Sequence, residues 1–126
     1  MIRVLVVDDH PVLRAGLEAV LRTEPGFVCV GTAGDGHELL AALRQTRPDV
    51  VLLDWRLGDE DGVALCRTLR AETAPPEVVL YTATADPGLE GQASAAGAYA
   101  VIEKSADIDV LFDALRLAAR GGRRAA

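Results

Sequence analysis

Short apolar runs alternate with segments of helical periodicity along this chain, and that alternation limits the possible folds more than any other feature. Five runs have the length and composition of β-strands, and they comprise residues 4–7, 27–30, 50–53, 78–81 and 99–102. The first, third and fourth are hydrophobic at every position, as expected of parallel strands that helices cover on both faces. The sequence therefore predicts a buried parallel sheet.

Apolar residues at helical spacing fall between these runs and predict amphipathic helices. The four clearest stripes consist of Leu13, Leu17, Val20 and Leu21; Leu39, Leu40 and Leu43; Gly62, Leu65, Cys66 and Leu69; and Ile108, Leu111, Phe112 and Leu115. Asp35, with Glu38 three residues later, forms a capping-box pattern at the second helix. Residues 86–96 predict a fifth, weaker helix, because Gly88 and Gly91 each cost about 1 kcal/mol relative to alanine.

The order of these elements predicts an α/β fold: a flavodoxin-like, doubly wound sheet of five parallel strands with five helices. Right-handed crossovers leave few strand orders, and five strands favour the order 2-1-3-4-5. A length of 126 residues suits one domain. We expect that domain to span residues 1–120, with residues 121–126 forming a frayed tail or the start of a linker.

Composition argues against several classes of function. A net charge of -6 makes the domain itself a poor ligand for nucleic acid or for an anionic membrane. No apolar run approaches the roughly 20 residues of a membrane span. Cys29 and Cys66 fit neither a disulfide framework nor a zinc pattern, so we expect a reducing, cytoplasmic location.

Polar side chains stand where four of the predicted strands end. Asp8 and Asp9 follow the first strand and Asp54 follows the third. Thr82 follows the fourth, and the fifth leads to Lys104, the only lysine of the chain. Ligands of open α/β sheets bind beyond the carboxyl ends of the strands, where the strand order reverses. We therefore expect these side chains to converge on one site.

The chemistry of this set indicates a phosphoryl group and a metal ion. Converging carboxylates repel one another unless a cation lies among them, and a site of oxygen ligands suits Mg²⁺. A carboxylate beside Mg²⁺ can act as a nucleophile, as in aspartyl-phosphate chemistry. The hydroxyl of Thr82 and the ammonium of Lys104 suit the oxygens of an incoming phosphoryl group.

Single residues of the set also have simpler structural interpretations. Asp8 and Asp9 could accept hydrogen bonds from amides at the start of the first helix, and Asp61 could cap the third helix. For His10, just before Pro11, we expect a role at the start of the first helix rather than in catalysis. A functional site explains the four strand ends together better than separate structural roles do.

Several motifs occur in a characteristic order and spacing: Asp8-Asp9-His10-Pro11, Asp54, Asp61-Gly62, Thr82-Ala83, Gly97-Ala98 and Lys104. Together they resemble the hallmarks of the receiver domain of two-component response regulators. The resemblance covers residues 2–120. The first motif and the ending Leu-Ala-Ala-Arg-Gly-Gly are most similar to the NarL/FixJ type, whose receivers usually precede a LuxR-type helix-turn-helix domain.

The resemblance implies a role for each residue of the acidic set. Asp54 is the implied phosphoacceptor. Asp9, Asp54 and the backbone carbonyl of Arg56 are the implied ligands of Mg²⁺, and Asp8 acts mainly through water bound to the metal. Thr82 is expected to move and bind the phosphoryl group, which also pairs with Lys104.

The resemblance also implies the partners. A histidine kinase donates the phosphoryl group from a phosphohistidine, and phosphorylation allows a homodimer. Regulation of transcription follows through a C-terminal helix-turn-helix domain that this chain does not contain, so that DNA is reached only through that domain. We expect no membrane partner. A stand-alone receiver that acts by protein–protein contact is the alternative.

The chain departs from the family pattern at two positions of the site. The usual proline four residues after the phosphoacceptor is Gly58, which predicts a more flexible loop. The usual aromatic switch residue three positions before the lysine is Val101. Tyr99 lies on the same predicted strand face, and the sequence leaves open whether it takes that role.

Two other functions compete with the receiver interpretation. A small phosphohydrolase could use Asp54 as its nucleophile, but neither Arg56 nor Thr84 supplies the acid or base that rapid release of phosphate needs. We therefore expect a phosphoacceptor rather than a turnover enzyme. A degenerate, receiver-like interaction module is disfavoured because every residue needed for phosphorylation is present.

Overall fold

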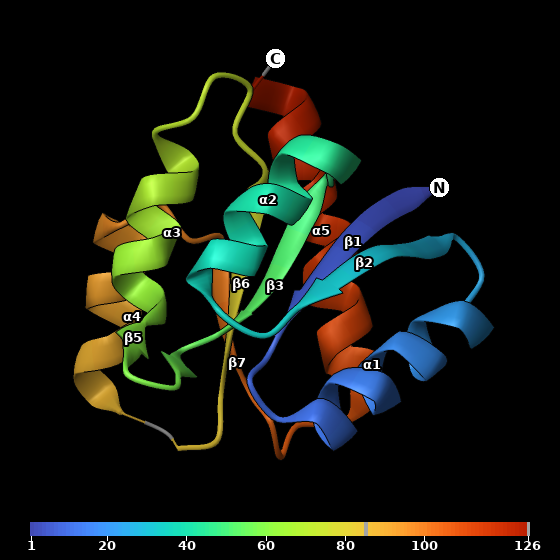
Figure 1. Cartoon of the computed structure of the whole chain (residues 1–126), viewed down its shortest axis with the longest axis horizontal. Coiled ribbons are helices and arrows are strands. Elements are labelled where there is room, and N and C mark those ends of the chain that lie inside the picture. The colour runs from blue at the N-terminus through green and yellow to red at the C-terminus, as the bar shows by residue number, and fades with distance from the viewer. Residues whose placement is uncertain (85, 126) are drawn as a thin grey trace.

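The computed structural model describes residues 1–84 and 86–125, which form one sheet between two layers of helices (Figure 1). The strands of the sheet are β1 (Ile2–Val7), β2 (Phe27–Ala33), β3 (Val50–Asp54), β6 (Glu77–Thr82) and β7 (Ala100–Glu103). Their order is β2-β1-β3-β6-β7, and every neighbouring pair is parallel. The predicted order 2-1-3-4-5 is confirmed, because β6 and β7 are the fourth and fifth strands of this sheet.

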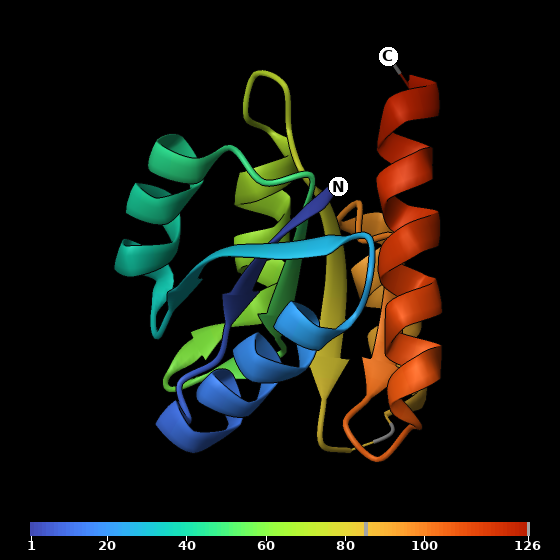
Figure 2. The ribbon, with the colours of Figure 1, turned by 90° about the vertical axis from the view of Figure 1, so that its right-hand side faces the viewer.

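Five helices connect and cover the strands. They are α1 (Pro11–Thr23), α2 (Gly36–Thr46), α3 (Gly62–Arg70), α4 (Pro87–Ala95) and α5 (Ile108–Ala125). In Figure 2 the sheet is seen between α2 and α3 on one side and α5 on the other. The weak helix predicted over residues 86–96 is therefore present, and the Asp86 carboxylate caps it by accepting a hydrogen bond from the Gly88 N–H.

The core consists of two apolar clusters, one on each face of the sheet. Alternate residues of β1 supply both: Leu5 packs toward α2, α3 and α4, whereas Val4 packs toward α1 and α5. Leu53 and Leu52 of β3 divide between the two clusters in the same way. This burial on both faces explains why β1 and β3 are apolar at every position. It also fixes where β1 and β3 end, and therefore where their terminal carboxylates lie.

The predicted helix caps form as the sequence indicates. The Asp35 carboxylate accepts a hydrogen bond from the Glu38 N–H at 2.8 Å, and the Glu38 carboxylate accepts one from the Gly34 N–H. Asp61 accepts a hydrogen bond from the Val63 N–H at the start of α3. The structural role considered for Asp61 is therefore the one that the structure shows.

A short antiparallel hairpin after β3 was not predicted. It pairs β4 (Arg56–Leu57) with β5 (Glu60–Asp61), and Gly58 in its turn has a φ of 62°. Proline cannot adopt a positive φ, so the hairpin in this form requires the departure from the usual proline. The hairpin returns the chain to β3 so closely that a Cβ at Gly62 would lie 2.5 Å from the Asp54 carbonyl oxygen.

The last helix is longer than the sequence indicates. The sequence predicts that regular structure ends near Arg120, yet α5 continues through Gly121 and Gly122 to Ala125. Gly121 lies against the Tyr99 ring, where a Cβ would come within 3.1 Å of a ring carbon, so close packing rather than helix termination explains this glycine. The separate role of residues 121–126 as a linker stays a prediction, and Ala126 lies outside the described residues. Within the part of the chain that the structure describes, no helix is both long and apolar enough to cross a membrane.

Candidate functional site

The carboxylates predicted to converge do so at the carboxyl edge of the sheet. Asp8 and Asp9 directly follow β1, and Asp54 is the last residue of the neighbouring strand β3. One ligand atom from each of these three residues and one from His10 all lie within 4.8 Å of one another. Asp8 and Asp54 are 1% and 4% exposed, so two of the three carboxylates are almost completely removed from solvent.

Lys104 supplies an internal cation to this cluster. Its Nζ atom donates hydrogen bonds to Asp54 Oδ2 at 3.2 Å and to Asp8 Oδ2 at 3.3 Å. The Lys104 N–H also donates to the Thr82 carbonyl at 2.7 Å, which fixes the lysine at the end of the sheet. The lysine therefore reduces the repulsion between the two buried carboxylates, a role that the sequence alone suggested for a metal ion.

Burial dominates the electrostatics of Asp54. Removal from solvent raises the pKa of its carboxyl group above the usual 3.8, the Lys104 ammonium lowers it, and the Asp8 carboxylate raises it further. Burial lowers the pKa of Lys104, but the Asp54 and Asp8 carboxylates outweigh this effect and leave it above its usual value. The two groups thus form a buried pair. Burial makes the ionised form of Asp54 less favourable, and the two carboxylates keep the Lys104 ammonium protonated.

Asp9 provides the observation that bears most directly on a metal ion. Its Oδ2 atom accepts a hydrogen bond from the Gly58 N–H at 3.1 Å, a bond that a proline at position 58 could not donate. Its Oδ1 atom is buried without a hydrogen-bond partner among the described residues. A buried carboxylate oxygen without a partner is costly, and a cation is the ligand that would satisfy it. The residues present therefore fit a divalent cation with oxygen ligands.

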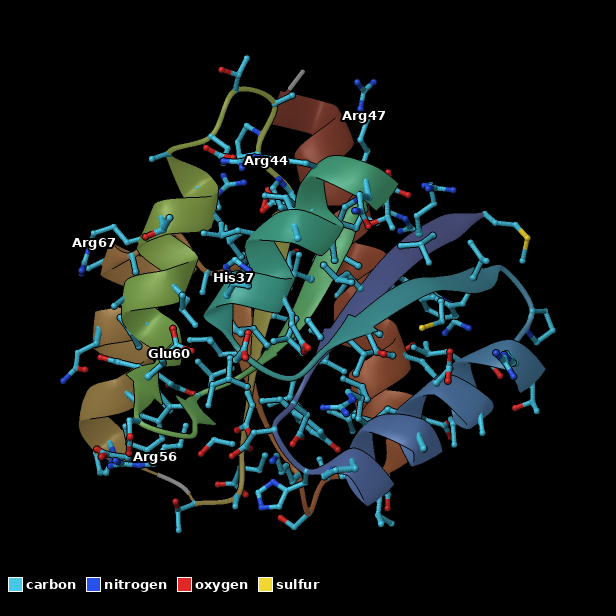
Figure 3. All side chains as sticks on the ribbon, in the orientation of Figure 1. His37, Arg44, Arg47, Arg56, Glu60 and Arg67 are labelled. Atoms are coloured by element: carbon cyan, nitrogen blue, oxygen red, sulfur yellow. The ribbon has the colours of Figure 1, made fainter. Side chains whose placement is uncertain are left out.

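The hairpin places Arg56 beside Asp54. The Arg56 N–H donates to Asp54 Oδ1 at 3.3 Å, and its guanidinium lies 4.4 Å from the centre of the neighbouring Trp55 ring. Figure 3 labels Arg56 and shows it at the hairpin. The position of Arg56 next to the cluster is thus established, and its carbonyl as a metal ligand stays a prediction.

Thr82 ends β6 and is buried, but its hydroxyl is engaged locally. The hydroxyl donates to the Thr84 carbonyl at 3.0 Å and accepts from the Thr84 N–H at 3.2 Å. Thr82 also lines a cleft of about 330 Å³ with Leu89 of α4 and Val101 of β7. To bind a phosphoryl group, the Thr82 hydroxyl would have to give up its bonds to Thr84.

The two positions considered for a switch residue occupy different surroundings. Val101 pairs with Leu80 in the sheet, is half-buried and lines the cleft beside Thr82. Tyr99 precedes β7, its backbone N–H donates to the Val78 carbonyl, and its ring lies against Gly121 of α5. Tyr99 in this structure therefore packs on the last helix and does not line the cleft.

His10 is the residue whose position sequence reasoning missed. Its Nδ1 atom shares a hydrogen bond of 3.1 Å with Asp8 Oδ1 and lies 3.2 Å from Asp9 Oδ1. It occupies the residue before α1, as expected, but its side chain makes no capping hydrogen bond to α1, a helix that the structure describes completely. The imidazole belongs to the acidic cluster, and a turn in which the Asp8 carboxylate accepts from the His10 N–H directs it there.

Comparison with known proteins agrees with this arrangement. Residues 4–116 match the family described as response regulator receiver domain. The transcriptional regulatory protein LiaR of Bacillus subtilis is 32% identical over 121 residues, which cover 96% of this chain and 57% of LiaR. A protein-glutamate methylesterase/protein-glutamine glutaminase of Nitrosospira multiformis is 40% identical over 111 residues, which cover 86% of this chain and 31% of that protein. The chain thus spans less than two thirds of the length of either relative.

A solved structure shares the fold over almost its whole length. The signal receiver domain of NarL from Mycobacterium tuberculosis superposes with a TM-score of 0.88 and 32% sequence identity, covering 95% of this chain and 97% of that one.

Proposed function

The chain belongs to the response regulator receiver domain family, and we propose that it accepts a phosphoryl group on Asp54 and in response changes a surface that a partner reads. The observation that carries this proposal is the pairing of a buried Asp54 carboxylate with the only lysine of the chain, next to an unpartnered oxygen of Asp9. A buried nucleophile between a fixed ammonium and a cation-binding oxygen is arranged for an anionic, phosphorylated reactant.

The donor in this proposal is a phosphohistidine of a histidine kinase. An oxygen of the Asp54 carboxylate forms a bond to phosphorus while the bond between phosphorus and the histidine nitrogen breaks, and the electron pair of that bond stays on the imidazole. Lys104 Nζ, already 3.2 Å from Asp54, pairs with the oxygens of the transferred group. The Thr82 hydroxyl exchanges its bonds to Thr84 for a bond to the same group.

Mg²⁺ is the cation that we propose for the acidic cluster. Asp9, Asp54 and the Arg56 carbonyl would hold it directly, and Asp8 would act mainly through bound water. When bound, the ion neutralises negative charge on the phosphoryl oxygens and on the carboxylates. The Gly58 N–H keeps Asp9 in place beforehand, so part of the binding geometry exists before the ion arrives.

The output is proposed to run through α4, β7 and α5. Thr82 and Val101 line one cleft with residues of α4. When the Thr82 hydroxyl leaves Thr84, the packing of the residues next to α4 changes. A partner surface, a second copy after phosphorylation or a C-terminal DNA-binding domain can respond to this change. The LiaR relative is a transcriptional regulatory protein, which supports an output in transcription. We expect the protein to meet its kinase in the cytoplasm and to act as a phosphoacceptor rather than as a turnover enzyme.

Incubation with acetyl phosphate tests the proposal. With Mg²⁺, mass spectrometry should show a gain of one phosphoryl group on the wild type, and removal of Mg²⁺ with EDTA should abolish the gain. Asp54→Asn should gain none under either condition. Continuous release of phosphate without a stable adduct would instead indicate a phosphohydrolase, and no reaction at all would leave an interaction module without phosphorylation.

A further inference from the structure

We propose that His10 is a further ligand of the same cation site. Its ring nitrogen strengthens the binding of divalent first-row transition ions but adds little to the binding of Mg²⁺. The inference rests on the proposed function, since it concerns the cation of that site. It goes further because it adds His10 to the proposed ligands and names the class of cation that His10 favours.

The distances around His10 match those between neighbouring ligands of one ion. Two donor atoms that each lie about 2.1 Å from an octahedral ion, at right angles, are about 3 Å apart. The Nδ1 atom of His10 lies 3.1 Å from Asp8 Oδ1 and 3.2 Å from Asp9 Oδ1. One ligand atom of Asp54 belongs to the same group, within 4.8 Å of the others. A single ion can therefore reach all four residues with a small closure of the site.

The backbone holds the imidazole in this position. The His10 N–H donates to Asp8 Oδ1 at 2.8 Å, and the His10 carbonyl accepts from the Arg14 N–H at 2.9 Å. Pro11 restricts His10 to extended backbone angles, and its φ of -92° and ψ of 109° agree with that restriction. Because no capping bond to α1 engages the ring, binding a cation would not disrupt the start of the helix.

The unpartnered oxygen of Asp9 points to a ligand in this part of the cluster. Asp9 Oδ1 is buried without a hydrogen-bond partner among the described residues, although His10 Nδ1 lies 3.2 Å from it. The ring nitrogen makes its hydrogen bond to Asp8 Oδ1 at 3.1 Å instead, which leaves Asp9 Oδ1 as the oxygen that lacks a partner. A cation there would satisfy Asp9 Oδ1 and would replace the proton that the His10 ring nitrogen shares with Asp8.

Ligand type then decides which cation gains from His10. Mg²⁺ prefers oxygen ligands and keeps several waters, so an imidazole nitrogen adds little to its affinity. Imidazole is a good ligand for first-row transition ions, which also bind mixed nitrogen and oxygen sites more tightly along the series from Mn²⁺ to Co²⁺ and Ni²⁺. His10 should therefore raise the affinity of the site for transition ions and leave its affinity for Mg²⁺ nearly unchanged.

A different role for His10 predicts the opposite result. A protonated imidazole would act as a counter-ion of Asp8 and Asp9 and would compete with every cation for their oxygens. Removing His10 would then strengthen the binding of Mg²⁺ and Co²⁺ alike. The two roles differ in sign for Co²⁺, so one set of titrations distinguishes them.

We would titrate the full chain with Co²⁺ and with Mg²⁺, using Trp55 fluorescence for both ions and visible absorption for Co²⁺. Trp55 directly follows Asp54 and is the only tryptophan. His10→Asn is the test variant, because asparagine is also favoured just before a helix. His37→Asn is the matched control, since His37 is the only other histidine and lies on α2, outside the group of residues that could hold a cation. His10→Gln provides a second variant if His10→Asn does not melt cooperatively.

Loss of the His10 ring should weaken Co²⁺ binding at least about tenfold, a size typical for groups that support a bound metal. Mg²⁺ affinity should change less than about threefold, and His37→Asn should change neither. The Co²⁺ absorption spectrum should also shift in His10→Asn, because a nitrogen ligand is lost. Equal Co²⁺ affinity in wild type and His10→Asn, or tighter binding in the variant, overturns the inference. Phosphorylation of His10→Asn by acetyl phosphate and Mg²⁺ shows separately whether the proposed function holds.

Discussion

The acidic pocket (Asp8, Asp9 and Asp54) and the α4 region (Thr82, α4 and β7) meet at one edge of the sheet but are held in different ways. Contacts between residues distant in sequence fix the pocket: Lys104 joins Asp8 and Asp54, and the Gly58 N–H joins Asp9. In the α4 region, the Thr82 hydroxyl bonds to Thr84 of its own loop and, among the described residues, to no side chain of another element.

The packing of the two regions differs in the same direction. Asp8 follows β1 and Asp54 ends β3, two strands buried on both faces. By contrast, α4 has nine residues, two of them glycine, and buries the side chains of Leu89 and Ala93. Few buried apolar contacts and low helix propensity are the properties of a segment that opens or repacks at small cost. The proposed chemistry of this domain therefore lies on its most buried part, and the proposed response lies on its weakest helix.

The largest effect expected from this difference is a change of amide exchange confined to one region. Beryllofluoride with Mg²⁺, which mimics a phosphoryl group, should change exchange protection over α4 and β7 and leave α2 nearly unchanged. The physical reason is that Thr82 leaves Thr84 and alters the cleft beneath α4. Mass spectrometry of exchanged peptides measures it. A response limited to α2 would contradict the assignment of the output surface.

Lys104→Arg should show that the pocket requires a particular shape as well as a charge. Lys104 Nζ reaches two carboxylate oxygens from one point, and its side chain is only 17% exposed. The planar guanidinium is wider and cannot occupy the same position. We expect phosphorylation by acetyl phosphate to slow at least about tenfold, in the range for loss of one charge-stabilising donor.

The control for this variant exchanges an arginine for a lysine at an exposed ion pair. Arg22→Lys keeps the pairing with Glu18 on α1 and should phosphorylate at the wild-type rate. Normal phosphorylation and normal exchange changes in Lys104→Arg would remove the special role of the lysine.

Asp54→Asn should lose phosphorylation but gain stability when Mg²⁺ is absent. Burial raises the pKa of Asp54, so its ionised form destabilises the folded state at neutral pH, and the amide removes that cost at nearly equal volume. Because the substitution also loses the attraction between Asp54 and Lys104, we expect a net gain of only about 1 kcal/mol, or roughly 2–6 °C in melting temperature. Thermal melts in EDTA measure the difference.

The pH dependence of that gain follows from the direction of the shift. A carboxyl group whose folded-state pKa is raised destabilises nothing below its unfolded value of 3.8, where it is protonated in both states. The cost develops as pH rises through the folded-state pKa and is complete above it. The advantage of Asp54→Asn should therefore be small near pH 4 and full at neutral pH, and Mg²⁺ should reduce it by stabilising the wild type more. A variant that melts below the wild type in EDTA would show that the Lys104 pairing outweighs burial.

The regular elements and most of the site were predictable because they depend on patterns that extend over many residues. Apolar runs placed the five strands, and the rule for strand ends placed Asp8, Asp54 and Lys104 together. The β4–β5 hairpin was not predictable, since strands of two residues have no periodicity. The helix α5 extends past the point where the sequence predicts a frayed tail or linker, and Gly121 within it lies against Tyr99.

The position of His10 and the bonds of Thr82 depend on single local contacts rather than on patterns. The His10 ring lies toward the pocket, where its Nδ1 atom shares a hydrogen bond with Asp8 Oδ1. The Thr82 hydroxyl bonds to the backbone of Thr84, two residues further along the chain. Spacing in the sequence identifies the residue types that a site needs, but such contacts decide where each side chain points.

The smallest expected effect tests whether the weakness of α4 matters for the response. Gly91 lies in the interior of α4, and a Cβ there would meet no atom within 4 Å. Gly91→Ala should therefore stabilise the helix by about 0.5–1 kcal/mol without a clash. A stiffer α4 should reduce the exchange changes that beryllofluoride produces in α4, while phosphorylation of Asp54 stays at the wild-type level because the pocket is untouched.

Gly16→Ala is the matched control for this variant. Gly16 is an exposed interior glycine of α1, and a Cβ added there would likewise meet no atom within 4 Å. Both variants should melt higher by a similar amount, but only Gly91→Ala should weaken the response. An equal response in the two variants would mean that α4 moves as a rigid body, and that its glycines contribute to its marginal stability without contributing to signalling.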